Sequence, residues 1–137
     1  MTQKPYDVFV SYCEIDRGLG SFVHSALTSA GLDLYLNVWS MADVPSRSDW
    51  QEQMREAMLR AEFVVVLLTR SSLHSWHMAF EVGMAMFAFK PIFVLYDGLS
   101  ADELPKYVHQ HHVADVSQLP AIIDEMKSRL GTMAAAH

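Results

Sequence analysis

The chain has 137 residues, of which 51% are hydrophobic, 11% aromatic and 19% charged, a length and composition typical of one folded domain. Its single cysteine excludes an internal disulfide and a cysteine-based zinc site, and it suits a reducing, cytoplasmic compartment. The formal net charge of −6 argues against a nucleic-acid-binding surface, which needs clustered Lys and Arg. No apolar run approaches the roughly 20 residues that span a bilayer, and residues 1–6 contain no apolar signal core. We therefore expect a soluble protein that binds neither nucleic acid nor membrane.

Short apolar runs alternate with segments of helical periodicity, which predicts a parallel sheet with helices on both faces. In chain order, the predicted elements are strand 7–12, helix 19–30, strand 32–38, helix 50–61, strand 63–69, helix 80–88, strand 91–96, strand 113–116 and helix 119–130. The third and fourth strands are almost continuously apolar, as is typical of strands that helices cover on both faces. With right-handed crossovers, the expected fold is a flavodoxin-like, five-stranded α/β fold with strand order 2-1-3-4-5.

Particular residues mark where several of these elements end. Gly31 and Gly131 are predicted to end the first and last helices, and Asp49 is predicted to cap the second helix at its N-terminus. The long connection after the fourth strand is expected to contain one short helix at residues 101–107. Residues 133–137 are expected to form a frayed tail.

The predicted strand order also predicts where a ligand binds. In sheets of this kind, ligands bind at the carboxyl ends of the strands where the winding direction reverses, here between the first and third strands. The segments at this point are residues 11–18 and 70–81. The first segment contains neither a GxGxxG fingerprint nor a P-loop, and Ser11 and Asp16 are equally compatible with turn and N-cap roles.

The second segment leads to an acidic residue among apolar neighbours. Glu81 lies early in its predicted helix, and the residues at 80, 82, 84, 86 and 87 are all apolar. Because an isolated buried charge is costly, this carboxylate is predicted to be paired or to lie at the mouth of a site, where the helix dipole would favour its ionised form. Trp76 is a candidate to stack on a flat ligand ring, with core packing as the alternative. The histidines have no metal-ligand spacing, so no metal is expected.

Several segments resemble the Toll/interleukin receptor (TIR) domain family. The opening run YDVFVSY at residues 6–12, followed by Asp16 and Arg17, is similar to the first box of that family. Residues 31–35, 45–50 and 63–72 resemble later parts in the same order, so one TIR domain is expected over residues 1–137, with a core at about residues 6–130. The pair Trp76 and Glu81 resembles the family's tryptophan–glutamate pair, although the spacing is five residues here and four is usual. The aromatic third box of animal receptors is not recognisable, which favours the bacterial, NAD-cleaving type.

The resemblance implies an enzymatic activity and a set of site residues. Catalytic members of the family cleave the nicotinamide–ribose bond of NAD⁺, so NAD⁺ is expected as the substrate without a further cofactor, and Glu81 as the catalytic carboxylate. A carboxylate suits this reaction because the departing nicotinamide leaves an oxocarbenium-like ribose. The residues expected to bind the substrate are Phe9, Ser11, Tyr12, Asp43, Arg47, Arg70, Ser71 and Trp76, with Arg47 or Arg70 on a phosphate.

Three functions remain compatible with the sequence. The first is an NAD⁺ nucleosidase or ADP-ribosyl cyclase whose linear or cyclic ADP-ribose product is a signal in bacterial antiphage defence, read by a downstream effector. The second is a non-enzymatic scaffold that acts by homotypic TIR–TIR assembly, which catalytic members also undergo. The third is a nucleoside deoxyribosyltransferase-like enzyme, which residues 80–85 and the dipeptide Lys90-Pro91 resemble.

Overall fold

The computed structural model describes residues 5–40 and 48–135. Its strands are β1 (Tyr6–Cys13), β2 (Leu34–Trp39), β3 (Ala61–Leu68), β4 (Ile92–Tyr96) and β5 (His112–Asp115). Its α-helices are α1 (Arg17–Ser29), α2 (Ser48–Leu59), α3 (Trp76–Phe87) and α4 (Leu119–Ala135). Short 3₁₀ turns lie at Glu14–Asp16, Ala101–Glu103, Lys106–Val108 and Val116–Gln118.

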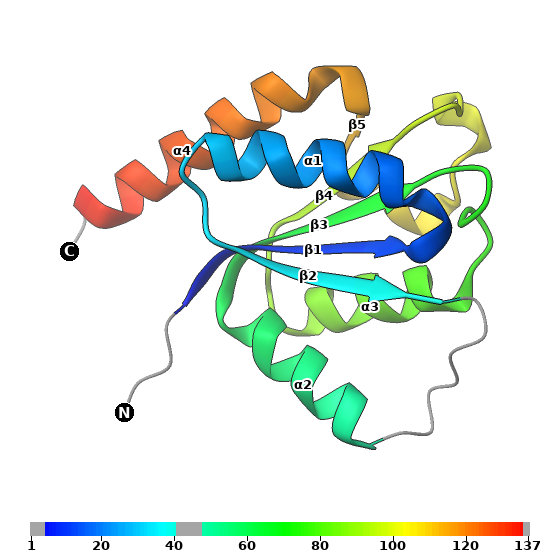
Figure 1. Ribbon diagram of the computed structural model, residues 1–137, viewed down its shortest axis with the longest axis horizontal. Helices are drawn as coiled ribbons and strands as arrows, with labels where there is room; N and C mark the ends of the chain where they lie inside the picture. The colour runs from blue at the N-terminus through cyan, green and yellow to red at the C-terminus, as the bar shows by residue number, and fades with distance from the viewer. Residues whose placement is uncertain (1–4, 41–47, 136–137) are drawn as a thin grey trace.

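The strands form one parallel sheet in the order β2-β1-β3-β4-β5. Helices α1 and α4 cover one face of the sheet, and α2 and α3 cover the other (Figure 1). This confirms the flavodoxin-like fold and strand order that the alternation of elements predicts. The central strands β3 and β4 are buried along nearly their whole length because helices cover both of their faces.

Each face of the sheet has its own apolar core. Along β1, Phe9 and Cys13 pack toward α2 and α3, while Val8, Val10 and Tyr12 pack toward α1 and α4. This alternation follows from the two-residue period of a strand. It sends every second side chain of β1 to the face that carries α3, which determines which residues can take part in a site there.

The structure corrects several predicted helix ends. Gly31 follows α1 with φ of +89°, as a C-terminal cap requires, so that prediction is confirmed. Asp49 was wrongly predicted as an N-cap, because α2 already begins at Ser48. Gly131 does not end α4, which keeps its helical backbone to Ala135, so the prediction of a tail from residue 133 is wrong for residues 133–135. Residues 136 and 137 lie outside the described part of the chain.

Two further differences have local causes. The single short helix predicted at residues 101–107 is instead two 3₁₀ turns, because Leu104 precedes Pro105 and a residue before proline is disfavoured in helical conformation. Helix α3 begins four residues earlier than predicted, at Trp76, because the Ser75 hydroxyl caps it and accepts a hydrogen bond from the backbone N–H of His77 at 3.1 Å. Among the described residues, no helix is long and apolar enough to cross a membrane.

Candidate functional site

Glu81 lies on the inner side of α3 and faces the sheet. The buried residues of α3 include His77, Met78, Glu81, Val82 and Ala85, and their spacing of three and four residues defines the inward face of the helix. Only 1% of Glu81 is exposed. The helical period therefore carries a carboxylate into the interior, at the level where β1 and β2 approach their carboxyl ends.

Two neighbouring strands supply the hydrogen-bond donors for this carboxylate. Ser11 of β1 places its hydroxyl oxygen 2.8 Å from both carboxylate oxygens of Glu81. The side-chain amide of Asn37, on β2, donates to Oε1 of Glu81. Trp39 donates from its indole N–H to the Ser11 hydroxyl oxygen at 3.2 Å. Ser11 is thus held between a donor and the carboxylate.

The sheet register explains why these residues meet. Ser11 and Asn37 are directly paired between β1 and β2, and Cys13 is paired with Trp39. Residues 37 and 39 share one face of β2 because side chains alternate along a strand. Neither Asn37 nor Trp39 is among the predicted site residues, although an asparagine inside an otherwise apolar strand is a signal that identifies the first.

Burial of Glu81 changes its acid–base behaviour. Loss of contact with water raises the pKa of the Glu81 carboxyl from 4.5 to about 8, although the hydrogen bonds from Ser11 and Asn37 act in the opposite direction. The carboxyl is therefore mostly protonated at neutral pH. The sequence predicts instead that the helix dipole keeps the Glu81 carboxyl ionised. The dipole has little effect on this carboxyl because Glu81 lies more than one turn into α3, and burial shields it from water.

An aromatic layer lies beside the carboxylate. The ring of buried His77 stacks on Trp39, with centroids 4.5 Å apart, and on Trp76, with centroids 3.6 Å apart. His77 stands four residues before Glu81, about one helical turn, so it shares the inward face of α3 and Trp76 lies outward. Trp76 is 39% exposed and its ring also contacts Phe80. The proposed stacking of Trp76 on a ligand stays a prediction.

A second polar contact joins the ends of β1 and β3. The Asp16 carboxylate accepts hydrogen bonds from the Thr69 hydroxyl at 3.0 and 2.9 Å. Burial raises the pKa of the Asp16 carboxyl, the bond from Thr69 lowers it, and the charge of Asp97 raises it. Asp16 makes no side-chain capping bond to α1, so its side-chain contact is with Thr69, directly after β3, and not with the helix that follows it.

Two of the predicted substrate-binding residues, Phe9 and Tyr12, are buried in the apolar cores on the two faces of the sheet. Phe9 has no exposed surface and stacks on Tyr35 in the core, with ring centroids 5.5 Å apart, and its predicted stacking on a base stays a prediction. Tyr12 faces the opposite side of the sheet, beneath α1, because it differs from Ser11 by one residue in a strand. A Cβ atom on Gly20 of α1 would lie only 2.3 Å from its ring.

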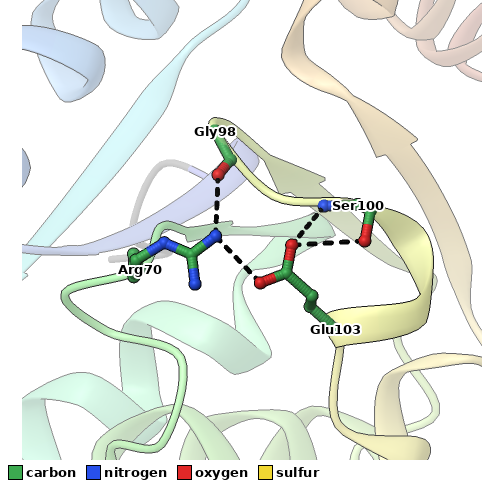
Figure 2. A network of polar contacts seen from close by, with 4 residues as sticks. All are labelled: Arg70, Gly98, Ser100 and Glu103. Atoms are coloured by element: carbon green, nitrogen blue, oxygen red, sulfur yellow. Dashed lines mark hydrogen bonds and ion pairs between the residues drawn. The ribbon is translucent and has the colours of Figure 1, made fainter.

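The remaining predicted residues lie in different places. Figure 2 shows Arg70 in an ion pair with Glu103 at 2.8 Å and donating to the carbonyl oxygen of Gly98 at 3.4 Å. Glu103 also accepts from the backbone N–H of Ser100 at 2.9 Å (Figure 2). The exposed residue Ser71 donates its backbone N–H to the Thr69 hydroxyl. Predicted residues Asp43 and Arg47 lie outside the described residues.

Comparison with known proteins identifies the family. A family model described as the TIR domain matches residues 8–129. The chain belongs to the TIR domain family. This family includes NAD-cleaving enzymes as well as assembly modules, and the match confirms the resemblance found in the sequence. No curated protein matches the chain.

Solved structures share the fold of this TIR domain. A metazoan TIR-STING receptor from C. gigas in complex with 2′,3′-cGAMP aligns with a TM-score of 0.67 and 18% identity, over 92% of this chain and 41% of the receptor. A second structure of such a receptor from C. gigas aligns with a TM-score of 0.66 and 18% identity, over 92% of this chain and 42% of the receptor. This chain therefore spans about two-fifths of those receptors, and at this identity the likeness shows the fold alone.

Proposed function

We propose that this TIR domain cleaves the nicotinamide–ribose bond of NAD⁺ and that Glu81 is its catalytic carboxylate. The observation that carries the proposal is the position of Glu81: a buried carboxyl on α3, held by the neutral donors Ser11 and Asn37 near the carboxyl ends of β1 and β2. Membership of a family that includes NAD-cleaving enzymes supplies the substrate class. Glu81 lies at the end of the sheet where ligands of open α/β folds bind.

The chemistry requires a negative charge beside the ribose. When the bond between C1′ and the nicotinamide nitrogen breaks, its electron pair goes to the nitrogen, so a neutral ring departs and C1′ becomes oxocarbenium-like. A carboxylate in a dry environment stabilises such a cation more strongly than one in water. Water then adds at C1′ and loses a proton to give ADP-ribose, or the ADP moiety attacks C1′ to give a cyclic product.

The raised pKa of Glu81 is compatible with this role when substrate is bound. NAD⁺ carries a positive charge on its nicotinamide ring, and a positive charge near a carboxyl favours the ionised form. Binding would therefore lower the pKa of Glu81 from about 8 in the free protein. Because only 1% of this residue is exposed, the proposal also requires neighbouring side chains to part so that the ribose can reach it.

The test is a product analysis with matched carboxylate variants. Purified protein at high concentration is incubated with NAD⁺, and nicotinamide and ADP-ribose products are separated by chromatography. We expect nicotinamide release by the parent chain and none by Glu81→Gln, while Glu125→Gln, which alters a carboxylate on α4 at the opposite face of the sheet (Figure 1), retains turnover. Equal turnover by the parent and Glu81→Gln would remove Glu81 from its proposed role.

The wider function follows from the same proposal. A linear or cyclic ADP-ribose product would be the signal in a cytoplasmic antiphage response, read by a separate effector. The family match favours NAD⁺ over the nucleoside substrates of deoxyribosyltransferases. The alternative is a scaffold without turnover, and the apolar outer side of α3 is the observation that favours assembly. Absence of nicotinamide release under conditions that promote assembly would support this alternative.

A further inference from the structure

The turn that follows α3 contains an unusual backbone conformation. Phe89 directly follows Ala88, the C-cap residue of the helix, and has φ of +57°. The backbone N–H of Phe89 donates to the carbonyl oxygen of Met86 at 3.0 Å. The backbone N–H of Lys90 donates to the carbonyl oxygen of Ala85, also at 3.0 Å. These two bonds form a Schellman motif, in which the residue with positive φ is usually glycine because a Cβ atom disfavours this conformation.

The Phe89 side chain does not offset this cost by packing in the core. It is 93% exposed, so folding removes almost none of its apolar surface from water. Backbone strain of this kind is concentrated at ligand-binding and other functional positions of proteins. We therefore expect the Phe89 ring to contact a molecule outside the chain.

Phe89 lines a groove at the end of the sheet where the strands begin. The groove has a volume of about 520 Å³, within the ~300–1,000 Å³ of small-molecule sites. The site around Glu81 is at the opposite end, toward which the arrowheads of β1 and β2 point in Figure 1. We define the basal groove by its lining residues: Glu62 and Phe63 of β3, residues 89–91 before β4, and Ser128, Arg129, Thr132 and Met133 of α4.

The basal groove combines aromatic and polar surfaces. Phe63, Pro91 and the Phe89 ring form an apolar part beside the sheet. Ser128 and Thr132 lie one turn apart on α4 and share one side of that helix, so their hydroxyls belong to the other wall. A flat aromatic ring suits the apolar part, because it can stack on Phe89 and gains from leaving water. Polar groups of the same ligand suit the wall that α4 forms.

Two opposite charges line the basal groove without pairing with each other. In the described part of the chain, residues 5–40 and 48–135, neither Glu62 nor Lys90 forms an ion pair. Lys90 donates to the backbone carbonyl oxygen of Leu59 at 3.1 Å. This oxygen is neutral, so the charge of the ammonium group is not compensated. The third charged residue of the groove, Arg129, already lies 3.6 Å from Glu125. The groove therefore offers one carboxylate and one ammonium group to a ligand.

A ligand that pairs with both groups must carry two charges of opposite sign. Its ammonium group would contact Glu62, its carboxylate would contact Lys90, and its ring would stack on Phe89. Because such a molecule is neutral overall, the net charge of −6 on the chain does not repel it. We propose that the basal groove binds a small aromatic zwitterion of the aromatic amino-acid class.

Nuclear magnetic resonance of the full chain tests the charge requirement, with L-tryptophan as the probe. Two analogues serve as controls: tryptamine lacks the carboxylate, and indole-3-propionate lacks the ammonium group. We expect L-tryptophan to shift the backbone amide signals of residues 62–63, 89–90 and 128–133. Each analogue should bind about fivefold more weakly, as for the loss of one surface ion pair. Equal affinity for all three, or signal shifts elsewhere only, would overturn the proposal. Shifts of the same signals with chain concentration alone would assign the groove to a second copy and also overturn it.

Two charge variants test the assigned contacts. Glu62→Gln should weaken the binding of L-tryptophan and leave that of indole-3-propionate unchanged, since that analogue has no ammonium group. Lys90→Gln should weaken the binding of L-tryptophan and leave that of tryptamine unchanged. A variant that weakened the binding of all three probes equally would contradict the proposed contacts.

Phe89→Gly separates ligand binding from folding. Glycine relieves the positive φ, so the denaturant midpoint should rise, while loss of the ring should weaken L-tryptophan binding by about tenfold. The matched control is Phe87→Gly, which removes an 89% exposed ring that lines a different hollow. Since Phe87 is helical, this control should lower the midpoint and retain binding. Equal binding by the parent and Phe89→Gly, or equal loss in both variants, would overturn the proposal. None of these measurements uses NAD⁺, so failure here is distinguishable from failure of the proposed enzymatic function.

Discussion

Replacing Glu81 by glutamine should remove most of a pH dependence of folding stability that the buried carboxyl produces. The pKa of Glu81 is about 8 in the folded chain, against 4.5 for an ordinary glutamate. Between these two values the folded chain keeps a proton that the unfolded chain releases. A rise in pH therefore favours unfolding, and the stability present below 4.5 is lost as the pH passes through about 8.

The size of this effect follows from the two pKa values. Each pH unit between 4.5 and about 8 costs about 1.4 kcal/mol in the free energy of unfolding, so the whole interval costs at most about 5 kcal/mol. A domain of this size has a total stability of ~5–15 kcal/mol, so the loss is measurable. Glutamine has no titratable proton, and its amide can still hydrogen-bond to Ser11 and Asn37.

Denaturant unfolding of the parent and Glu81→Gln, at a series of pH values from below 4.5 to above 8, measures the difference. Other titrating groups contribute equally to both chains and cancel. Glu103→Gln is the control, because the backbone N–H of Ser100 and then Arg70 hold the pKa of the exposed Glu103 carboxyl below its usual value, so it titrates below this window. If Glu81→Gln showed the same slope as the parent, the carboxyl would not be buried and protonated as described.

Three further predictions concern activity and stability. If Glu81 acts as the ionised carboxylate in NAD⁺ cleavage, kcat/KM should rise with pH and level off above about 8, and a flat profile would contradict this role. Gly20→Ala should lower the free energy of unfolding by ~1–3 kcal/mol because its Cβ would lie 2.3 Å from the Tyr12 ring, whereas Gly18→Ala, with nothing within 4 Å, should raise it by up to ~1 kcal/mol. Denaturant titrations measure the free energy of unfolding of both variants. Equal changes for Gly20→Ala and Gly18→Ala would contradict the described packing. Arg70→Ala breaks an exposed ion pair and should change stability by less than ~1 kcal/mol, while a raised KM for NAD⁺ would support the predicted phosphate contact and an unchanged KM would refute it.

The layered fold could be predicted because it follows from local patterns. Continuous apolar runs such as residues 63–69 mark strands covered on both faces, and the handedness of crossovers leaves few strand orders. Helix ends were predicted less well. Gly131 is compatible with a helix interior at a cost of about 1 kcal/mol, and only the backbone conformation distinguishes that case from a C-terminal cap.

The site residues also divide into those that the local sequence pattern predicts and those that it does not. Glu81 could be singled out as an acidic residue among apolar neighbours, but Tyr12 was predicted beside it although it meets the opposite face of the sheet. Phe9 meets the same face as Glu81 and is buried in its apolar core. Ser11, Asn37 and Trp39 are far from Glu81 in the chain. The register between β1 and β2 brings them together beside it.

The amino-acid sequence by itself determined the family, the order of elements and the identity of the buried acid, because these depend on residue type and on spacing along the chain. Only the tertiary structure decided that Ser11 and Asn37 hold this acid, that His77 takes the inward position beside Trp39, and that Glu81 is held mostly protonated. The physical reason is that hydrogen-bond partners and exclusion of water depend on which elements pack together, and that information is spread over residues distant in the sequence.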